Sequence, residues 1–227
     1  MTGPVVMIVL AKAPVPGQVK TRLCPPATPA EAADIAAAAL LDTLDAVRGV
    51  PGGRLVVPMA GRLDRAARGC ELEAALRGVP TPAQRGADLG ERIAAAHIDA
   101  ACGLPTFQIG MDTPQVEPAL LAESAAHLLR PGGVDAVLGP ATDGGWWALG
   151  LRDPRAAALV ASVPTSRADT GERTVQALRS AGLRVGSLPE LTDVDTAADA
   201  LRVRAAAPRT RFAAAVDRVA QLVAAGC

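Results

Sequence analysis

The stretch Val-Val-Met-Ile-Val-Leu, residues 5–10, decides the fold class of this chain. It is a continuous apolar run rich in β-branched residues, which is typical of a strand buried on both faces of a parallel sheet. A Pro- and Gly-rich loop follows directly. Residues 28–31 then read Thr-Pro-Ala-Glu, a capping box with proline at the first helical position, so a helix is predicted from there to about Arg48.

The rest of the chain alternates between strand and helix patterns. Further strands are predicted at residues 55–57, 105–109, 135–138, 146–149 and 184–188. Further helices are predicted at residues 64–76, 88–102, 117–129, 170–181, 197–206 and 209–224. This alternation predicts an α/β fold with a doubly wound, mostly parallel sheet and helices on both faces. Without internal repeats or a low-complexity linker, residues 1–227 are expected to form one domain.

Composition excludes several classes of protein. Lys plus Arg and Asp plus Glu number 23 each, so the formal net charge is zero and no general nucleic-acid or membrane-surface binder is indicated. The four cysteines form no C-x-x-C pair, which favours reduced thiols over a zinc site or a disulfide framework. The apolar start ends by Lys12, too early for a membrane span, and it lacks the basic start of a signal peptide. A soluble cytoplasmic protein is expected.

Ligands of open α/β sheets bind beyond the carboxyl ends of the strands, so the loops after strands carry the functional candidates. The first loop, residues 11–23, places Lys12, Lys20 and Arg22 on an irregular turn around Gly17. Backbone donors and cations in one short stretch suit a polyphosphate. The glycine spacing matches neither a Walker A loop nor a dinucleotide fingerprint. On charge alone, a solvated basic turn explains it equally well.

Two further loops carry aspartates. Asp112 follows the strand at residues 105–109, and Asp193 and Asp195 lie two apart, so both point the same way in an extended backbone. Carboxylates placed together repel unless a cation joins them, and Mg²⁺ takes such ligands together with phosphate oxygens. The alternative is that these aspartates cap the turns and helices that follow. Taken together, the three favour a metal site for Mg²⁺ or Mn²⁺.

The fourth loop, residues 139–145, ends in Asp143-Gly144-Gly145, directly before both tryptophans of a chain with 2% aromatic residues. Glycines permit close approach of a ligand, and Asp143 is a candidate for binding substrate hydroxyls or acting as a general base. The alternative is a hairpin-type turn with one tryptophan anchoring the core. Gln84, shortly before a predicted helix start that contains Gly90, is a candidate for reading a nucleobase edge.

In this order the loops resemble those of a bacterial glycosyltransferase family with the GT-A fold of nucleotide-diphospho-sugar transferases, which some genomes associate with radical-SAM and arsenosugar pathways. The resemblance covers about residues 5–202 and rests on residues 11–23, 84–92, 110–114, 139–145 and 193–199. The chain departs from that family's pattern where an acceptor would bind. Trp146-Trp147 replace the usual Tyr, Thr165 stands near a usual Trp, and Ala197 replaces a usual Pro.

A similar layout occurs in guanylyltransferases that activate phospholactate or phosphoenolpyruvate. By that resemblance Asp112, Asp193 and Asp195 would bind the metal. The implied nucleotide-binding residues are Ala11, Lys12, Gly17, Lys20, Arg22, Gln84 and Gly90. Lys20 and Arg22 would contact the phosphates and Gln84 the base, and Lys20, Asp112 and Asp143 would take part in catalysis.

Three functions are compatible with this pattern. A metal-dependent glycosyltransferase using a nucleotide-sugar and an unknown small-molecule acceptor is preferred, since the Asp-Gly-Gly-aromatic turn resembles that branch. A nucleotidyltransferase that joins an NTP to a phosphorylated small molecule would share the fold, metal and basic loop. A non-catalytic nucleotide-binding module is the third, and the three aspartates at strand ends disfavour it because a pure binder has little need of them.

Overall fold

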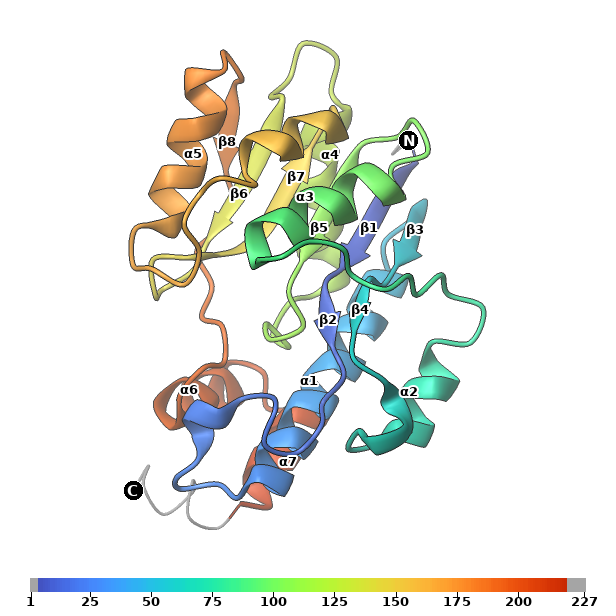
Figure 1. Ribbon diagram of the computed structural model, residues 1–227, viewed down its shortest axis with the longest axis vertical. Coiled ribbons are helices and arrows are strands. Elements are labelled where there is room, and N and C mark those ends of the chain that lie inside the picture. Colours follow the sequence, from blue (N-terminus) through green and yellow to red (C-terminus); the bar gives the residue numbers. More distant parts are fainter. Residues whose placement is uncertain (1–3, 220–227) are drawn as a thin grey trace.

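The computed structural model describes residues 4–219, and its centre is a six-stranded sheet (Figure 1). In chain order the sheet consists of β1 (Val5–Val9), β3 (Gly53–Val56), β5 (Thr106–Ile109), β6 (Ala136–Pro140), β7 (Trp146–Leu151) and β8 (Val185–Ser187). In space the order is β3-β1-β5-β7-β6-β8, and β7 alone runs antiparallel to its neighbours. The expected mixed, mostly parallel sheet is therefore confirmed. A separate two-stranded sheet pairs β2 (Ala11–Lys12) with β4 (Met59–Ala60).

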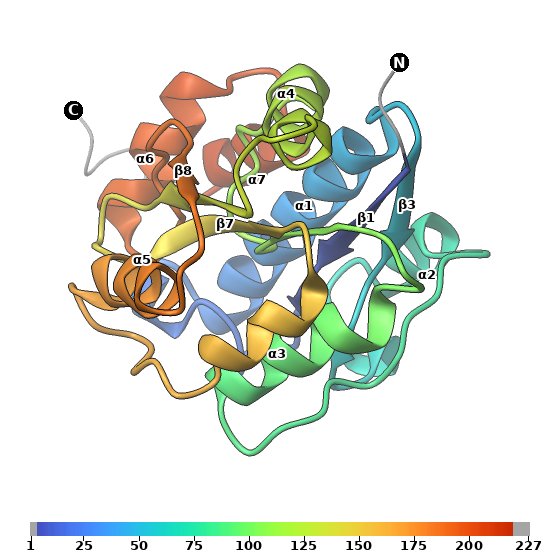
Figure 2. The same ribbon diagram turned by 90° about the horizontal axis from the view of Figure 1, so that it is seen from above.

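Helices cover both faces of the sheet (Figure 2). In chain order they are α1 (Pro29–Arg48), α2 (Gly69–Ala75), α3 (Leu89–Ala100), α4 (Pro118–Leu129), α5 (Thr170–Ser180), α6 (Ala197–Ala206) and α7 (Arg211–Asp217). Short 3₁₀ helices add η1 (Thr21–Leu23), η2 (Leu63–Arg65) and η3 (Pro154–Leu159). Helices α1 and α4 lie on one face, and α3 and η3 on the other.

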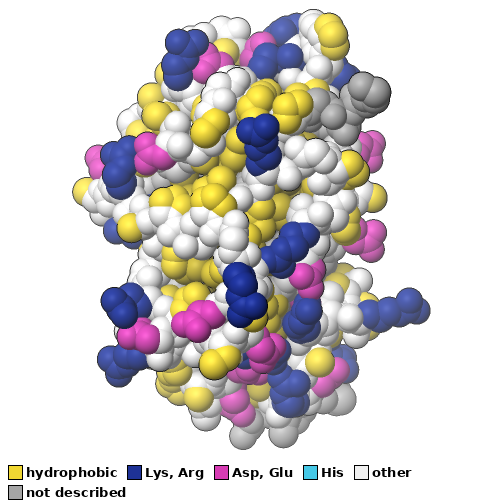
Figure 3. Space-filling view, turned by 90° about the vertical axis from the view of Figure 1, so that its right-hand side faces the viewer, with side chains coloured by type: hydrophobic (Ala, Val, Ile, Leu, Met, Phe, Trp, Pro, Cys, Tyr) yellow, Lys and Arg dark blue, Asp and Glu magenta, His cyan; other side chains and the backbone are white. Residues whose placement is uncertain are grey.

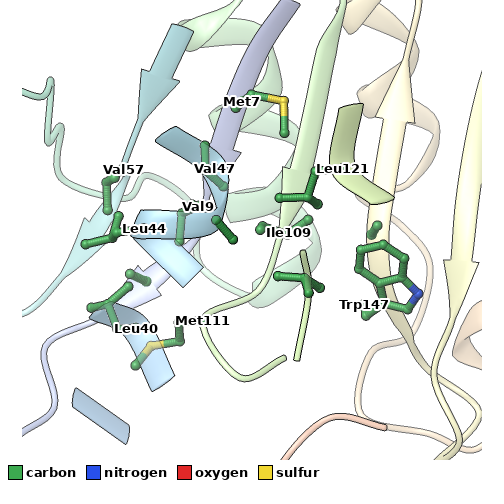
Figure 4. Packing of buried hydrophobic residues seen from close by; sticks show 14 of the residues in the cluster. Met7, Val9, Leu40, Leu44, Val47, Val57, Ile109, Met111, Leu121 and Trp147 are labelled. Atoms are coloured by element: carbon green, nitrogen blue, oxygen red, sulfur yellow. The ribbon is translucent and has the colours of Figure 1, made fainter. Parts of the chain in front are cut away.

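Helix α1 begins where the sequence predicts. The Thr28 hydroxyl accepts a hydrogen bond from the Glu31 amide, and the Glu31 carboxylate accepts one from the Thr28 amide, so the capping box is formed. The helix is buried nearly all round because two apolar clusters flank it. One includes Leu40 and Leu44, which face the sheet with Val9 and Ile109 (Figure 4).

The other flank of α1 packs against the chain's last helices. Its cluster joins Ile35 of α1 to Leu23, Val203 of α6 and Phe212 of α7, all of them buried. This packing places residues 191–196, which connect β8 to α6, near the basic loop that precedes α1 (Figure 1). Two halves of the candidate site are thereby brought together.

Two expectations about helices are corrected. The helix expected at residues 64–76 is split into η2 and α2, because Arg68 adopts a left-handed conformation with φ 51° between them. The last helix, expected at residues 209–224, ends at Asp217, and the expected residues 220–224 lie outside the described part. The described residues contain no helix long and apolar enough to cross a membrane.

The described cysteines, Cys24, Cys70 and Cys102, are free thiols. On the face shown in Figure 3, basic and acidic side chains are interspersed, as expected for a chain of zero net charge.

Candidate functional site

A cavity of about 470 Å³ opens at the carboxyl ends of β1 and β5. Four aspartates line it, namely Asp112, Asp143, Asp193 and Asp195, together with Arg22 and Arg167. Its apolar wall is formed by Leu10, Leu89, Ile93 and Trp146, and its floor includes Gln108. Segments from across the chain thus meet at the edge of the sheet where ligands of α/β proteins bind.

Three of these aspartates form a cluster. One carboxylate oxygen each of Asp112, Asp193 and Asp195 lies within 4.8 Å of the others. Asp112 follows β5, and the backbone amide of Val194 donates to its carbonyl at 3.0 Å. The Gln115 side chain donates to the carbonyl of Thr192 at 2.5 Å. These two contacts hold the strip that carries Asp193 and Asp195 beside the turn after β5, which is why the carboxylates converge.

Two cations of the first loop reach this cluster. The Lys20 ammonium lies 2.8 Å from Asp112 Oδ2 and 3.0 Å from Asp195 Oδ1, and its side chain is only 12% exposed. Arg22 Nη1 lies 3.0 Å from Asp195 Oδ2. Lys20 adopts a left-handed conformation with φ 46° and ψ 38° at the start of η1. A non-glycine residue in that region is uncommon, and here it accompanies an inward-pointing ammonium.

The charge balance of the cluster is uneven. Burial would by itself lower the pKa of Lys20, but the carboxylates of Asp112 and Asp195 outweigh it and raise that pKa above its usual value. Asp193 has no cation partner among the described residues. Burial, followed by the charges of Asp112, Asp143 and Asp195, raises the pKa of Asp193 to about 7. The cluster therefore retains negative charge that a further cation would stabilise.

The Asp-Gly-Gly turn lies beside the segment that carries Asp193, because the Thr142 amide donates to the carbonyl of Leu191 at 3.0 Å. The exposed carboxylate of Asp143 accepts a hydrogen bond from the Gly145 amide at 2.7 Å. Gly144 has φ 87°, and a Cβ there would lie 1.9 Å from the carbonyl oxygen of Ala168. Only glycine allows the backbone of the turn to come this close to the backbone of Ala168, so the turn holds residues 165–168 at the cavity rim. Trp147 is 2% exposed in the core and donates its indole N–H to Pro189, whereas Trp146 lines the cavity.

Other predicted nucleotide-binding residues lie outside the lining of this cavity. Lys12 is exposed and its ammonium donates to the carbonyl of Gln18. Gly17 is an exposed loop residue with φ 76°. Gly90 is buried in the first turn of α3, where a Cβ would lie 2.6 Å from the carbonyl oxygen of Ala161. Its close packing against that segment accounts for glycine there without a ligand.

Gln84 and Ala11 contact each other directly. The side-chain amide of Gln84 donates to the carbonyls of Ala11 and Pro58, at 2.7 and 3.1 Å. Gln84 lines a separate cavity between residues 80–85 and α3. The contact joins β2 to the residue before β4, and the base-reading role predicted for Gln84 stays a prediction.

Several cavity residues were missed from the sequence. The sequence marks Leu10, Leu89 and Ile93 only as apolar parts of a strand and a helix, and in the segment 165–168 it marks Thr165 alone, as a departure from the family pattern where an acceptor would bind. Gln108 did leave a signal, because it is the one amide side chain in the otherwise apolar end of the strand Thr-Phe-Gln-Ile. A polar side chain in such a strand is informative when it faces a ligand cavity.

The acidic cluster fits a divalent metal on the chemistry of its donors. Three carboxylate oxygens are hard ligands of the kind that Mg²⁺ and Mn²⁺ take, usually together with water and phosphate oxygens. Lys20 and Arg22 pair with Asp112 and Asp195, whereas Asp193 has no cation partner among the described residues and could take a metal ion as one. Lys20 and Arg22 contact the cluster directly, and Arg22 also lines the cavity, so positive charge lies next to the carboxylates.

Comparisons with known proteins agree with this architecture. The model of a bacterial family described as "Uncharacterized protein conserved in bacteria (DUF2064)" matches residues 43–167, more than half of the chain. Among curated protein sequences, no significant relative is found.

Solved structures of the same fold are nucleotide-utilising transferases. A protein from Desulfovibrio desulfuricans G20, provisionally assigned as a nucleotide-diphospho-sugar transferase, is 27% identical with a TM-score of 0.84, over 96% of both chains. A 4-diphosphocytidyl-2C-methyl-D-erythritol synthase from Anaerococcus prevotii is 11% identical, with a TM-score of 0.57 over 91% of this chain and 99% of that one. CMP:2-keto-3-deoxy-manno-octonic acid synthetase, solved with CTP, is 12% identical, with a TM-score of 0.54 over 90% and 98%. The last two likenesses show the fold alone.

Proposed function

The chain belongs to the bacterial family DUF2064, and we propose that it is a divalent-metal-dependent glycosyltransferase that uses a nucleotide-sugar donor. The observation that carries the proposal is the convergence of Asp112, Asp193 and Asp195 with Lys20 and Arg22 at the mouth of one cavity. Carboxylates for a metal and cations for phosphates, side by side, are what a diphosphate ester needs for binding. The likeness to nucleotide-diphospho-sugar transferases supports the same class of donor.

In this proposal each residue has a distinct task. Asp112, Asp193 and Asp195 hold the metal, which when bound supplies positive charge to the leaving diphosphate. Lys20 and Arg22 orient the diphosphate by charge-assisted hydrogen bonds. Asp143, which lines the same cavity, orients an acceptor hydroxyl and takes its proton as that oxygen attacks the anomeric carbon, and the nucleoside diphosphate leaves.

The acceptor side of the cavity supports a hydroxyl-bearing molecule. Thr165, Ser166 and Asp143 line it on the side of the Asp-Gly-Gly turn. Hydroxyl and carboxylate groups placed together suit the several hydroxyls of a sugar or polyol. The resemblance to transferases associated with radical-SAM and arsenosugar pathways implies an acceptor from such a pathway, and this stays a prediction.

A nucleotidyltransferase is the second candidate, since the solved structures of this fold include a nucleotidyl transferase and a synthetase in complex with CTP. The two functions differ in the bond that breaks. Glycosyl transfer releases a nucleoside diphosphate from a nucleotide-sugar, whereas nucleotidyl transfer releases pyrophosphate from an NTP.

Phosphorus NMR separates the two. The protein is incubated with Mn²⁺ or Mg²⁺ and either nucleotide-sugars or NTPs, with water and simple polyols as acceptors. The proposal expects slow, metal-dependent formation of a nucleoside diphosphate from one nucleotide-sugar, lost in Asp112→Asn. Metal-dependent pyrophosphate release from an NTP, with no turnover of nucleotide-sugars, would replace the glycosyltransferase by the second candidate.

A further inference from the structure

Gln108 is a buried amide that the fold itself leaves without a partner. It lies on β5, is 2% exposed and lines the cavity. Its side-chain oxygen, Oε1, has no hydrogen-bond partner among the described residues. A buried amide group without a partner lowers the stability of the folded protein, so we expect another interaction of this group to offset that cost.

The surroundings of Gln108 are apolar. Leu10, Ile93 and Trp146 form the nearby cavity wall and belong to one hydrophobic cluster, which also contains Leu149. Leu149 is the residue opposite Gln108 on the neighbouring strand β7. A methionine or leucine at position 108 would fill such a site with no unpaired polar atom.

The other glutamines at this end of the sheet have structural partners. The amide of Gln84 donates to two backbone carbonyls, and that of Gln115 donates to the carbonyl of Thr192. Those two side chains therefore hold backbone segments in place. The oxygen of Gln115 also lacks a partner, but its amide nitrogen is engaged, whereas the Gln108 side chain contacts no backbone carbonyl among the described residues and faces the cavity.

We propose that Gln108 reads the edge of the nucleobase of the bound nucleotide, with Leu10, Leu89, Ile93 and Trp146 enclosing the faces of the base. This assignment rests on the proposed function, which makes the ligand a nucleotide. An amide both accepts and donates, and rotation about its last bond exchanges oxygen and nitrogen. It therefore matches the adjacent N–H and acceptor positions on the edge of a base.

A sugar fits this end of the cavity less well. A sugar ring carries several hydroxyls, each needing a partner, and among Gln108, Leu10, Leu89, Ile93 and Trp146 only the amide of Gln108 and the indole N–H of Trp146 form hydrogen bonds. The hydroxyl side chains of Thr165 and Ser166 and the carboxylate of Asp143 line other parts of the cavity. A planar base with apolar faces and one polar edge leaves no group unmatched.

The test uses Gln108→Met, which keeps the length of the side chain and removes its hydrogen bonds. Calorimetry measures binding of nucleoside diphosphates and, separately, of pyrophosphate, each with Mn²⁺, and thermal unfolding measures the stability of the ligand-free protein. We expect the dissociation constant of the best nucleoside diphosphate to rise roughly ten- to a hundred-fold. Pyrophosphate binding is unchanged, and the ligand-free protein is as stable as the wild type or more so.

Thr106→Val is the matched control. Thr106 lies on the same face of β5, but its hydroxyl contacts the buried ring of His97 at 2.7 Å instead of lining the cavity. This variant should lower the melting temperature and leave the dissociation constant of the nucleoside diphosphate unchanged.

Four results overturn the inference without touching the proposed function. The first is equal affinity of wild type and Gln108→Met for the nucleoside diphosphate, and the second is an equal loss for pyrophosphate. The third is a loss confined to nucleotide-sugars, which would make this a sugar subsite. The fourth is equal affinity of the wild type for pyrophosphate and for nucleoside diphosphates. That result would exclude a base subsite but would leave the metal and phosphate site in place. Wild type that binds neither ligand with Mn²⁺ contradicts the proposed function itself, and the inference with it.

Discussion

Lys20 joins two carboxylates that lie 92 and 175 positions further along the chain. Its ammonium neutralises part of the charge of Asp112 and Asp195, while Asp193 stays without a cation. At the scale of single residues, the candidate site is thus a balance between carboxylates that repel one another and two cations that hold them together.

Replacing Lys20 should change the affinities for metal and nucleotide in opposite directions. Lys20→Met removes a positive charge from the cluster, so the affinity for Mn²⁺ alone is expected to rise. The affinity for a nucleoside diphosphate in the presence of Mn²⁺ is expected to fall about ten-fold or more, because a charge-assisted contact to phosphate is lost. Calorimetric titration measures both.

Lys12→Met is the control for this prediction. Lys12 belongs to the same loop, but its ammonium contacts only the carbonyl of Gln18 among the described residues. Both affinities should stay near those of the wild type. Nucleotide affinity lost equally in the two variants would contradict the special position of Lys20.

Asp193 should make the metal-free protein less stable as the pH rises. Burial and the neighbouring carboxylates raise its pKa from 3.8 to about 7 on folding. Between these values the folded protein keeps a proton that the unfolded chain has lost, so stability present below pH 4 is lost as the pH rises through 7. Asp193→Asn removes this titration.

Urea unfolding with EDTA at pH 4.5 and pH 8 measures the effect. The free energy of unfolding of Asp193→Asn minus that of the wild type is expected to increase from pH 4.5 to pH 8. The increase should be on the order of 1–2 kcal/mol, after allowance for the partial exposure of the side chain. A difference between wild type and variant that is the same at both pH values would show that Asp193 titrates normally.

At the scale of elements, local signals in the sequence located most helices and strands. The Thr28 capping box predicts the start of α1, and the apolar run at residues 5–10 predicts β1. Local signals did not predict the break at Arg68, because a left-handed residue that is not glycine has no reliable signature. They also did not reveal the small sheet of β2 and β4, whose strands have two residues each.

Besides the apolar packing between α1 and α7, one side chain of α1 caps the start of α7. The carboxylate of Asp42, on α1, accepts hydrogen bonds from the backbone amides of Arg211 and Phe212, at 3.1 and 2.8 Å. These amides belong to the first turn of α7, where helix N–H groups lack partners within the helix. Asp42→Ala is therefore expected to lower the free energy of unfolding by about 1–2 kcal/mol in urea titrations.

Asp45→Ala is the matched control. Asp45 lies three residues further along the same helix and contacts the side chain of the same Arg211, at 2.7 Å, without touching the backbone of α7. The cost of this exposed ion pair should be about 0.5 kcal/mol or less. Equal losses in the two variants would contradict the role of Asp42 as a cap.

At the scale of the whole molecule, the sequence predicted which loops carry the site more reliably than which residues face the ligand. Asp112, Asp193 and Asp195 converge because the carboxyl ends of parallel strands meet at one edge of the sheet, a rule that holds without knowledge of the strand order. The strand order and the reversed direction of β7 depend on packing between distant segments, which local patterns do not encode.

The apolar end of the cavity shows the same limit. Leu10 follows β1, Leu89 and Ile93 belong to α3, and Trp146 begins β7, so these residues are remote in sequence. Each has an ordinary explanation as a core residue, and their common orientation toward a cavity appears only in three dimensions. The sequence marks the three cations of the first loop alike, but only the structure separates them: Lys20 and Arg22 contact the aspartate cluster, and Lys12 does not.

The central claim is that three aspartates form a metal site that serves nucleotide binding. Isothermal titration of Mn²⁺, alone and with nucleoside diphosphates, into wild type, Asp112→Asn and Asp195→Asn tests it most directly. Asp99→Asn, at an exposed residue outside this cavity, is the control. We predict that wild type and Asp99→Asn bind Mn²⁺ and bind the nucleotide more tightly in its presence, and that both site variants lose this coupling. Nucleotide binding that is independent of Mn²⁺, or unchanged in Asp112→Asn and Asp195→Asn, would contradict the claim.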